Sequence, residues 1–151
     1  MKRYAAVVAI AALSLLGGGC ASSGPTPPAQ AASAPVRVVY HMTLGLDEAQ
    51  RGLGNIRNHL AADPSARIVV VTNGNGIEFM LDGAKDRNGN PFDVSVQELK
   101  SRGVGFSLCN NTLVQRKIDR SRVIPEADIV TSGVAEAARL QAREGFVYLR
   151  P

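Results

Sequence analysis

Short apolar segments alternate with amphipathic segments along the chain from about residue 36 onward. The apolar segments are rich in β-branched residues, and the first is nearly apolar on both faces, which is typical of strands covered by helices on both sides. The alternation predicts an α/β fold of three layers, in which helices flank a mostly parallel sheet in a flavodoxin-like, doubly wound arrangement. The predicted strands span residues 36–42, 68–71, 104–108, 127–131 and 146–149.

The segments between these strands have the spacing and the end signals of helices. Apolar residues recur every three or four positions after Asp47, which can cap the first long helix. Ser132 can cap the last helix, and Gly145 ends it. The remaining predictions are a short apolar helix at 77–81, a loop at 83–91, a helix at 93–102 and a helix that starts at Asn110 or Asn111.

The first 19 residues have the pattern of a lipoprotein signal peptide. Lys2 and Arg3 precede an apolar stretch that is too short to span a bilayer as a permanent helix. Cys20 then stands where bacterial lipoproteins are cleaved and acylated. Residues 20–35 are otherwise small or polar and uncharged, with nothing to bury, which predicts a tether before a single domain at 36–151.

Two cellular addresses follow from this N-terminal segment. Lipidation of Cys20 predicts a protein attached to the cell envelope by its lipid alone. The periplasmic side of the outer membrane is favoured because Ala21 and Ser22, not Asp, follow the cysteine. Cleavage near Ala29-Gln30-Ala31 would instead release a soluble periplasmic protein. With either address, Cys109 is the single free thiol of the mature domain, so no internal disulfide is expected.

Charge argues against a nucleic-acid partner. The formal charge is +4, but it includes Lys2 and Arg3, which leave with the signal peptide. One basic cluster stands out, and no aromatic residues interleave it, so a solvated basic edge is expected there rather than a nucleic-acid site. The cluster consists of Arg116, Lys117, Arg120 and Arg122.

Motif spacing argues against a cofactor or a metal. Gly74-Asn75-Gly76 lacks the third glycine of a dinucleotide site and the Lys-Ser/Thr pair of a phosphate-binding loop, so it predicts a tight turn. Two distant histidines and one thiol give no metal-ligand spacing. No nucleophile elbow of the Gly-x-Ser-x-Gly type occurs either. We therefore expect no cofactor, no metal and no hydrolase chemistry.

Residues at the ends of the predicted strands are the candidates for a site, because ligands bind beyond the carboxyl ends of strands in open α/β sheets. Cys109 occupies such an end and precedes a helix start, which favours a thiolate; the alternative is a thiol that only packs. His41 is a candidate base for Cys109, or a histidine that satisfies a loop hydrogen bond. His59 is expected at the surface. The candidate binding residues are Asn73, Gly74, Asn110 and Thr112.

Residues 104–113, which surround Cys109, resemble the cysteine segment of the DsrE/DsrF-like family. The resemblance extends in order and spacing to segments within 38–41, 71–74, 124–136 and 144–151. It implies a three-layer α/β fold and assembly into homotrimers or homohexamers. It also implies that Cys109 corresponds to a cysteine that carries sulfur as a persulfide in cytoplasmic relays.

Two functions are compatible with these features. The first is a sulfur-carrier or thiol-reactive protein that acts through an accessible Cys109, with its sulfur donor and acceptor left open. The second is a non-catalytic, oligomeric lipoprotein that presents a cleft near His41, Asn73 and Cys109 to a small ligand or a partner.

Overall fold

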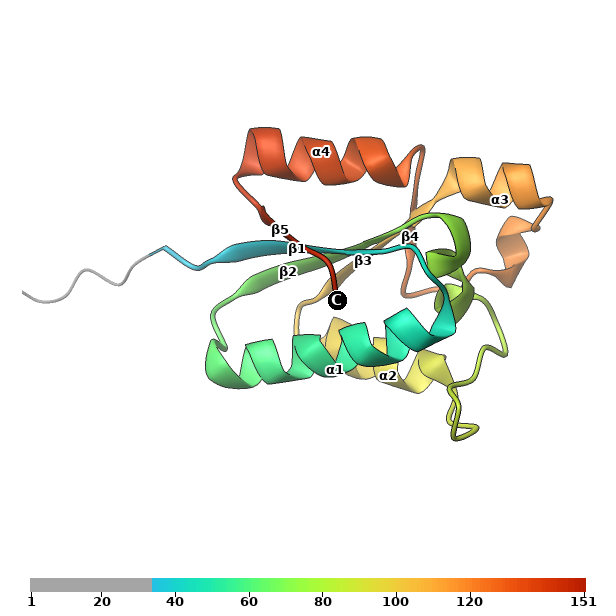
Figure 1. The fold of residues 1–151 in the computed structure, drawn as a ribbon, viewed down its shortest axis with the longest axis horizontal. Helices are drawn as coiled ribbons and strands as arrows, with labels where there is room; N and C mark the ends of the chain where they lie inside the picture. Colours follow the sequence, from blue (N-terminus) through green and yellow to red (C-terminus); the bar gives the residue numbers. More distant parts are fainter. Residues whose placement is uncertain (1–33) are drawn as a thin grey trace, which may run out of the picture. The chain divides into compact units, whose positions relative to one another are not determined.

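Five strands form one sheet in which every neighbouring pair is parallel (Figure 1). The computed structural model describes residues 34–151, so the predicted signal peptide, Cys20 and most of the predicted tether lie outside the described residues. The strand order is β4-β3-β2-β1-β5. The strands are β1 (Arg37–Met42), β2 (Arg67–Thr72), β3 (Gly105–Cys109), β4 (Asp128–Val130) and β5 (Val147–Leu149).

Helices cover both faces of this sheet. The steps from β1 to β4 each move to the next strand in one direction, and the last connection returns to place β5 beside β1. Because crossovers between parallel strands are right-handed, the helix of the returning connection, α4, lies on the face opposite α1 and α2 (Figure 1). The helices are α1 (Leu46–Ala62), α2 (Phe92–Ser101), α3 (Asn110–Arg116) and α4 (Gly133–Glu144), with 3-10 helices η1 (Gly74–Met80) and η2 (Arg120–Arg122).

The predicted three-layer α/β architecture with a parallel sheet is confirmed. The strand order differs from the flavodoxin order, 2-1-3-4-5, in that β1 has β5 rather than β3 as its second neighbour. Consequently β2 separates β1 from β3, which matters for the site below. Within residues 34–151, none of the helices is both long enough and apolar enough to cross a bilayer.

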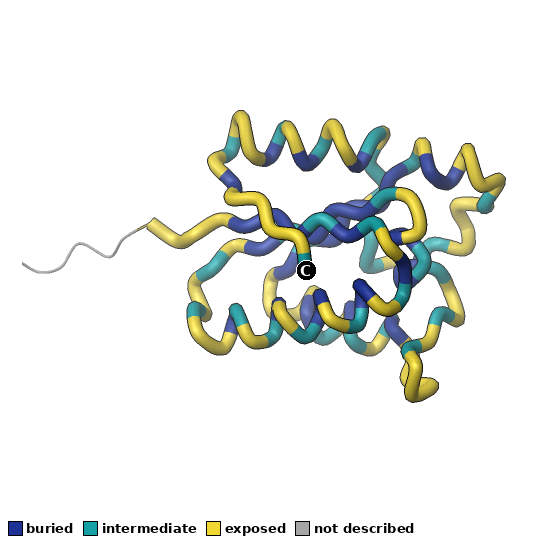
Figure 2. The backbone as a smooth tube through the Cα atoms, viewed as in Figure 1, coloured by how far each residue is buried: buried dark blue, intermediate teal, exposed yellow. Residues whose placement is uncertain are grey.

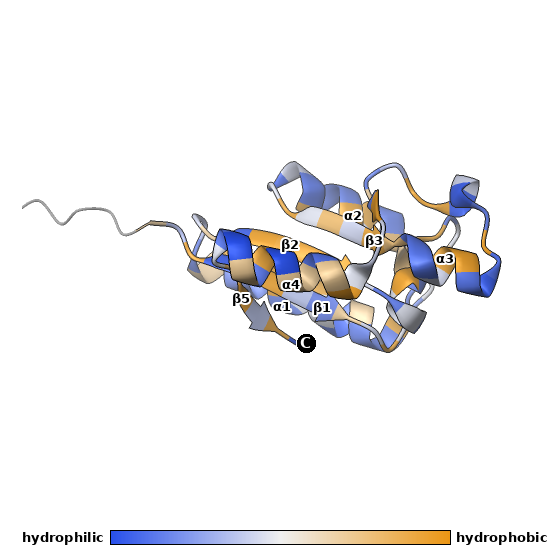
Figure 3. Ribbon diagram, turned by 90° about the horizontal axis from the view of Figure 1, so that it is seen from above, coloured by the Kyte–Doolittle hydropathy of each residue, from blue (hydrophilic) through white to orange (hydrophobic). Residues whose placement is uncertain are grey.

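Two hydrophobic clusters fill the spaces between the layers. The larger cluster joins alternate residues of the central strands to α1, η1 and α2, and the smaller joins the other face of β1 and β2 to α4. On β1, Tyr40 and Met42 belong to the larger cluster and Val39 to the smaller. The central strands are therefore buried on both faces, as their sequence predicts, whereas the edge strand β5 is exposed throughout (Figure 2). In the perpendicular view α4 lies across the apolar β2, which it contacts (Figure 3).

The structure confirms both predicted ends of α4 but not the predicted cap of α1. Ser132 caps α4 by accepting a backbone hydrogen bond of 3.3 Å, and Gly145 ends the helix in the left-handed region with φ of 70°. Asp47 does not cap α1, because the helix begins at Leu46 and its N-cap residue is Gly45. The Asp47 carboxylate instead forms an ion pair with Arg87.

A buried carboxylate holds the turn between β1 and α1. Glu48 is 1% exposed, and its Oε2 accepts hydrogen bonds from the backbone N–H groups of Thr43 and Leu44. Arg150, near the end of the chain, approaches the other oxygen with Nε at 3.7 Å. These contacts fix the carboxyl end of β1, where the candidate site begins.

Candidate functional site

The carboxyl ends of β1, β2 and β3 lie at one edge of the sheet, because all three strands are parallel and in register. This edge carries His41 near the end of β1, Asn73 just after β2 and Cys109 at the end of β3. The sequence analysis therefore placed these residues at the correct edge. Their individual contacts define two neighbouring groups, one around the thiol and one around the histidine.

Cys109 lies where two helices begin. It is the N-cap residue of α3, and the first residue of α4, Gly133, packs directly against it. A Cβ atom at position 133 would lie 3.3 Å from the Cβ of Cys109 and 2.6 Å from the carbonyl oxygen of Thr72, so only glycine allows α4 to start this close. The close approach leaves Cys109 only 4% exposed, so the expectation of an accessible thiol is not met in the single chain.

The thiol of Cys109 is surrounded by hydrogen-bond donors. Burial raises the pKa of the Cys109 thiol, but the hydrogen bonds that its sulfur accepts outweigh burial and leave the pKa below its usual value. The groups that lower the pKa are the N–H of Gly133, the hydroxyl and the N–H of Thr112, and the N–H of Asn111, which also donates a hydrogen bond of 3.2 Å to the carbonyl of Thr131. A thiolate is therefore stabilised at this position, and a thiolate is the nucleophilic form of cysteine.

Thr112 connects the thiol to the loop after β2. Its Oγ1 accepts a hydrogen bond of 3.1 Å from the N–H of Gly74, which leaves the hydroxyl hydrogen for the sulfur of Cys109. Gly74 has a φ of 57°, a conformation that favours glycine, so the direction of this N–H depends on the residue type. The two candidate binding residues Thr112 and Gly74 thus orient the thiol.

Removing the Thr112 hydroxyl is expected to make Cys109 less reactive. In a Cys20→Ser background, Thr112→Val loses one donor to the sulfur, which raises the pKa of Cys109 and lowers the thiolate fraction at neutral pH. We expect reaction with iodoacetamide to slow by about threefold to tenfold. Thr112→Ser keeps the hydroxyl and is expected to react like the parent; equal rates for all three proteins would contradict this role of Thr112.

His41 has partners other than Cys109. Its Nε2 lies 2.7 Å from Oδ1 of Asn73, and its Nδ1 lies 2.9 Å from the hydroxyl of Tyr148. Both ring nitrogens are therefore engaged, and β2 lies between the strands that carry His41 and Cys109. The hypothesis that His41 is the base of Cys109 finds no contact in the structure. The alternative of a histidine that satisfies local hydrogen bonds describes its geometry.

Asn73 is the link between the two groups. A Cβ atom at Gly133 would lie 3.3 Å from the Cβ atoms of both Asn73 and Cys109, so the start of α4 touches both residues. Tyr148, on the other side of His41, was not a candidate in the sequence. Only the pairing of β5 with β1 brings Tyr148 to His41, since the two lie 107 positions apart in the chain. No local pattern could have identified it.

Asn110 and His59 each have a partner within the protein that the sequence did not indicate. The side chain of Asn110 accepts hydrogen bonds from Nε and Nη2 of Arg120, at 3.1 and 2.5 Å, so its oxygen is taken by the connection to η2. His59 is half-buried rather than a surface residue, because its Nδ1 lies 3.0 Å from the hydroxyl of Tyr40.

Three of the four residues of the basic cluster form salt bridges or hydrogen bonds with other parts of the domain. Arg116 forms a salt bridge of 3.0 Å with Glu78, and Arg122 donates a hydrogen bond of 3.3 Å to the carbonyl of Asp82. Together with the Arg120–Asn110 contact, these bonds attach the basic segment to η1 and its neighbours. Among residues 34–151, no group of three or more His, Cys, Asp or Glu side chains is arranged to hold a metal ion.

Comparisons relate the chain to known proteins. The sequence pattern of the DsrE/DsrF-like family matches residues 29–150. A protein of unknown function, MTH1491 from Methanobacterium thermoautotrophicum, is similar in structure with a TM-score of 0.66 and 32% identity, covering 77% of this chain and 99% of that chain. The ychN protein from E. coli has a TM-score of 0.60 at 14% identity, covering 78% and 98%, and that likeness shows the fold alone. No curated protein matches the chain.

Proposed function

The chain belongs to the DsrE/DsrF-like family, and we propose that it is an exported, thiol-reactive protein whose Cys109 accepts sulfane sulfur and hands it on. The observation that carries the proposal is the set of donors around the sulfur of Cys109. Three N–H groups and one hydroxyl lower the pKa of a thiol that burial alone would raise. A thiol that only packs has no need of such an environment.

The proposed chemistry is an exchange between sulfur atoms. The Cys109 thiolate attacks the outer sulfur of a polysulfide, a new S–S bond forms to Sγ, and the S–S bond in the donor breaks with its electron pair leaving on the shortened polysulfide. In the second step an acceptor thiolate attacks the outer sulfur of the persulfide, and Cys109 leaves as a thiolate. A lowered pKa assists this second step, because thiols of lower pKa leave faster.

The small exposed fraction of Cys109 limits the size of the sulfur donor that can reach it. At 4% exposure, the thiol admits a small inorganic donor more readily than a bulky one. The start of α4, at Gly133, packs beside Cys109 and Asn73 and covers the thiol from that side. Inorganic polysulfide fits this restriction, and it is the donor used in the test below.

Sulfur loading of the full chain tests the proposal. We expect the reduced protein, treated with inorganic polysulfide, to gain about 32 Da, the mass of one sulfur atom, at Cys109. A reductant should remove the added mass. Cys20→Ser should keep the adduct and Cys109→Ser should lose it, as measured by intact mass and peptide mapping. An adduct confined to Cys20, or none with any concentration of polysulfide, would contradict the proposal.

The same burial of Cys109 favours a second candidate function. A thiol that is almost covered, next to the hydrogen-bonded pair His41 and Asn73, suits a non-catalytic module that binds a small ligand or a partner. Sulfur relays of the family are cytoplasmic, whereas this chain is predicted to be exported. If this second function holds, Cys109→Ala leaves the phenotype of the intact gene unchanged.

The address and assembly that we propose rest on the sequence. Lipid attachment at Cys20 would place the domain on the periplasmic side of the outer membrane, with the lipid as its only membrane contact. The family resemblance supports assembly into a homotrimer or homohexamer. An exposed edge strand, β5, is compatible with such assembly, since its three residues are all exposed in the single chain.

A further inference from the structure

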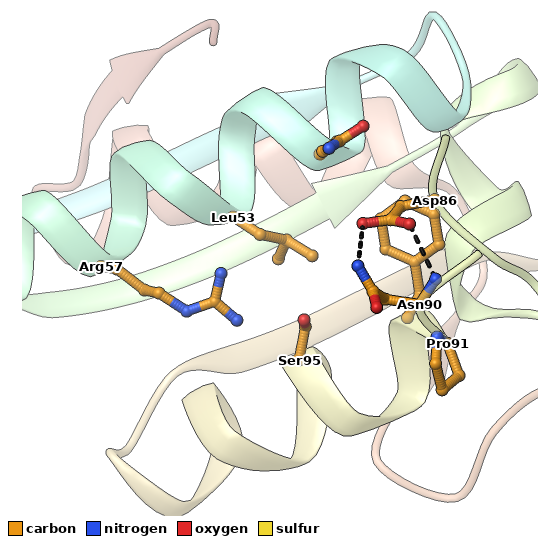
Figure 4. Close-up of a pocket in the computed structure, with 8 residues that line it drawn as sticks. Leu53, Arg57, Asp86, Asn90, Pro91 and Ser95 are labelled. Carbon is orange, nitrogen blue, oxygen red and sulfur yellow. Dashed lines mark hydrogen bonds between the residues drawn. The ribbon is translucent and has the colours of Figure 1, made fainter. Parts of the chain in front are cut away.

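A polar cavity lies on the face of the sheet opposite α4, between α1, α2 and the loop that precedes α2 (Figure 4). Its volume is about 240 Å³, which suits a small organic molecule. Leu53 and Phe92 belong to its lining and are themselves buried in the core. The other lining residues are Gln50, Arg57, Asp86, Asn90, Pro91 and Ser95.

Several polar groups at this cavity have no partner within the protein. In residues 34–151, neither the Gln50 amide nor the Ser95 hydroxyl takes part in a hydrogen bond, and the two Nη atoms of Arg57 are also free of one. These residues come from both helices, α1 and α2, and line the same cavity, where Figure 4 shows Arg57 and Ser95. Ligand sites present a small number of polar groups that fix the orientation of the ligand.

Arg57 shares its acidic partner with a second arginine. Nε of Arg57 contacts Oε2 of Glu98 at 2.7 Å, but Oε1 of the same carboxylate contacts Arg102 at 3.1 Å. Two guanidinium groups therefore share one carboxylate. The free edge of Arg57 presents paired N–H donors, a geometry that matches a carboxylate of a ligand.

The loop side of the cavity carries a negative charge, on Asp86. Asp86 is fixed by hydrogen bonds from the backbone N–H groups of Asn88 and Asn90, both at 2.8 Å, and from the Asn90 amide at 3.1 Å. The bond from the Asn90 side chain lowers the pKa of Asp86, so this carboxylate stays ionised. It repels a second ligand carboxylate and accepts hydrogen bonds from ligand hydroxyl groups.

We propose that this cavity binds a small hydroxylated monocarboxylate, with its carboxylate on Arg57 and its hydroxyl groups toward Gln50, Ser95 and Asp86. The site is separate from Cys109, which lies at the carboxyl edge where α4 begins on the opposite face. Binding here would therefore be independent of sulfur chemistry at the thiol.

Binding of racemic glycerate to the full chain tests the proposal, with NMR titration of the isotope-labelled protein as the readout. We expect saturable shifts of the amides of Gln50, Arg57 and Ser95. Glycerol lacks the carboxylate and propionate lacks the hydroxyl groups, so each is expected to bind about tenfold more weakly. Glycerol that binds as well as glycerate, or no saturable shift at millimolar glycerate, would overturn the proposal.

Two arginine variants separate a specific contact from general attraction between charges. Arg57→Gln is expected to weaken glycerate binding about tenfold or more. Arg51→Gln removes the same charge from an exposed position on the same helix, outside the cavity lining, and is expected to bind within about twofold of the parent. Equal weakening in the two variants would overturn the role of the cavity, and the amide spectrum of each variant reports whether it is folded.

Discussion

Replacing Gly76 by alanine is expected to destabilise the protein by more than about 3 kcal/mol. A Cβ atom at position 76 would lie 2.0 Å from the carbonyl oxygen of Met42, 2.4 Å from its carbonyl carbon and 2.7 Å from the nitrogen of Thr43. All three atoms are backbone atoms at the end of β1, a central strand, so they cannot turn away as a flexible side chain can. The variant must instead displace η1 from the sheet.

The loss expected for Gly76→Ala is a large share of the stability of a domain of this size, which is about 5–15 kcal/mol. Denaturation by urea, followed by circular dichroism, measures it. Gly54→Ala is the matched control, because a Cβ atom at position 54 meets nothing within 4 Å in the middle of α1. That variant is expected to gain about 0.5–1 kcal/mol. Unchanged stability of Gly76→Ala would contradict the observed packing of η1 on β1.

Replacing Gly133 by alanine is expected to impair the thiol of Cys109 more than any change at the surface of α4. The added Cβ atom would lie 2.6 Å from the carbonyl oxygen of Thr72, so the start of α4 must move away. The N–H of Gly133 then no longer donates to the sulfur of Cys109, and the pKa of the thiol rises. We expect about tenfold slower reaction with iodoacetamide at neutral pH.

The pH dependence of this reaction distinguishes loss of the thiolate from a change in access. Only the thiolate reacts, so the rate rises with pH through the pKa of Cys109 and then levels off. A raised pKa in Gly133→Ala moves the rise to higher pH, whereas wider access raises the plateau. Val134→Ala alters a 60% exposed side chain at the next position and is the control, expected to follow the parent curve. A parent-like curve for Gly133→Ala would contradict the role of this N–H.

The layered fold was predictable because its signals are local. β-Branched segments apolar on both faces indicate strands buried on two sides, and the Ser132 cap and the Gly145 end of α4 appear where the sequence indicated them. The start of α1 was less predictable. Asp47 has the residue type of a cap, but its carboxylate is paired with Arg87, forty positions away in the chain.

The sequence predicted which edge of the sheet carries the candidate site, but not the contacts that its residues make there. Placing Cys109, Asn73 and Gly74 at strand ends needed only the parallel arrangement of the sheet. The pairing of His41 with Tyr148, rather than with Cys109, needed the strand order. No local pattern reports which strand inserts between two others.

The sequence by itself thus determined the fold class, the family resemblance and the position of a single free thiol at the carboxyl edge of the sheet. These depend on residue types and on spacing along the chain, which set burial and strand direction. The tertiary structure alone decided what surrounds that thiol. The N–H of Gly133 joins the groups in the first turn of α3 at Cys109 only because the glycine lets α4 begin against Thr72 and Asn73. That approach is a contact between distant segments, and it sets the pKa of Cys109 through short-range hydrogen bonds.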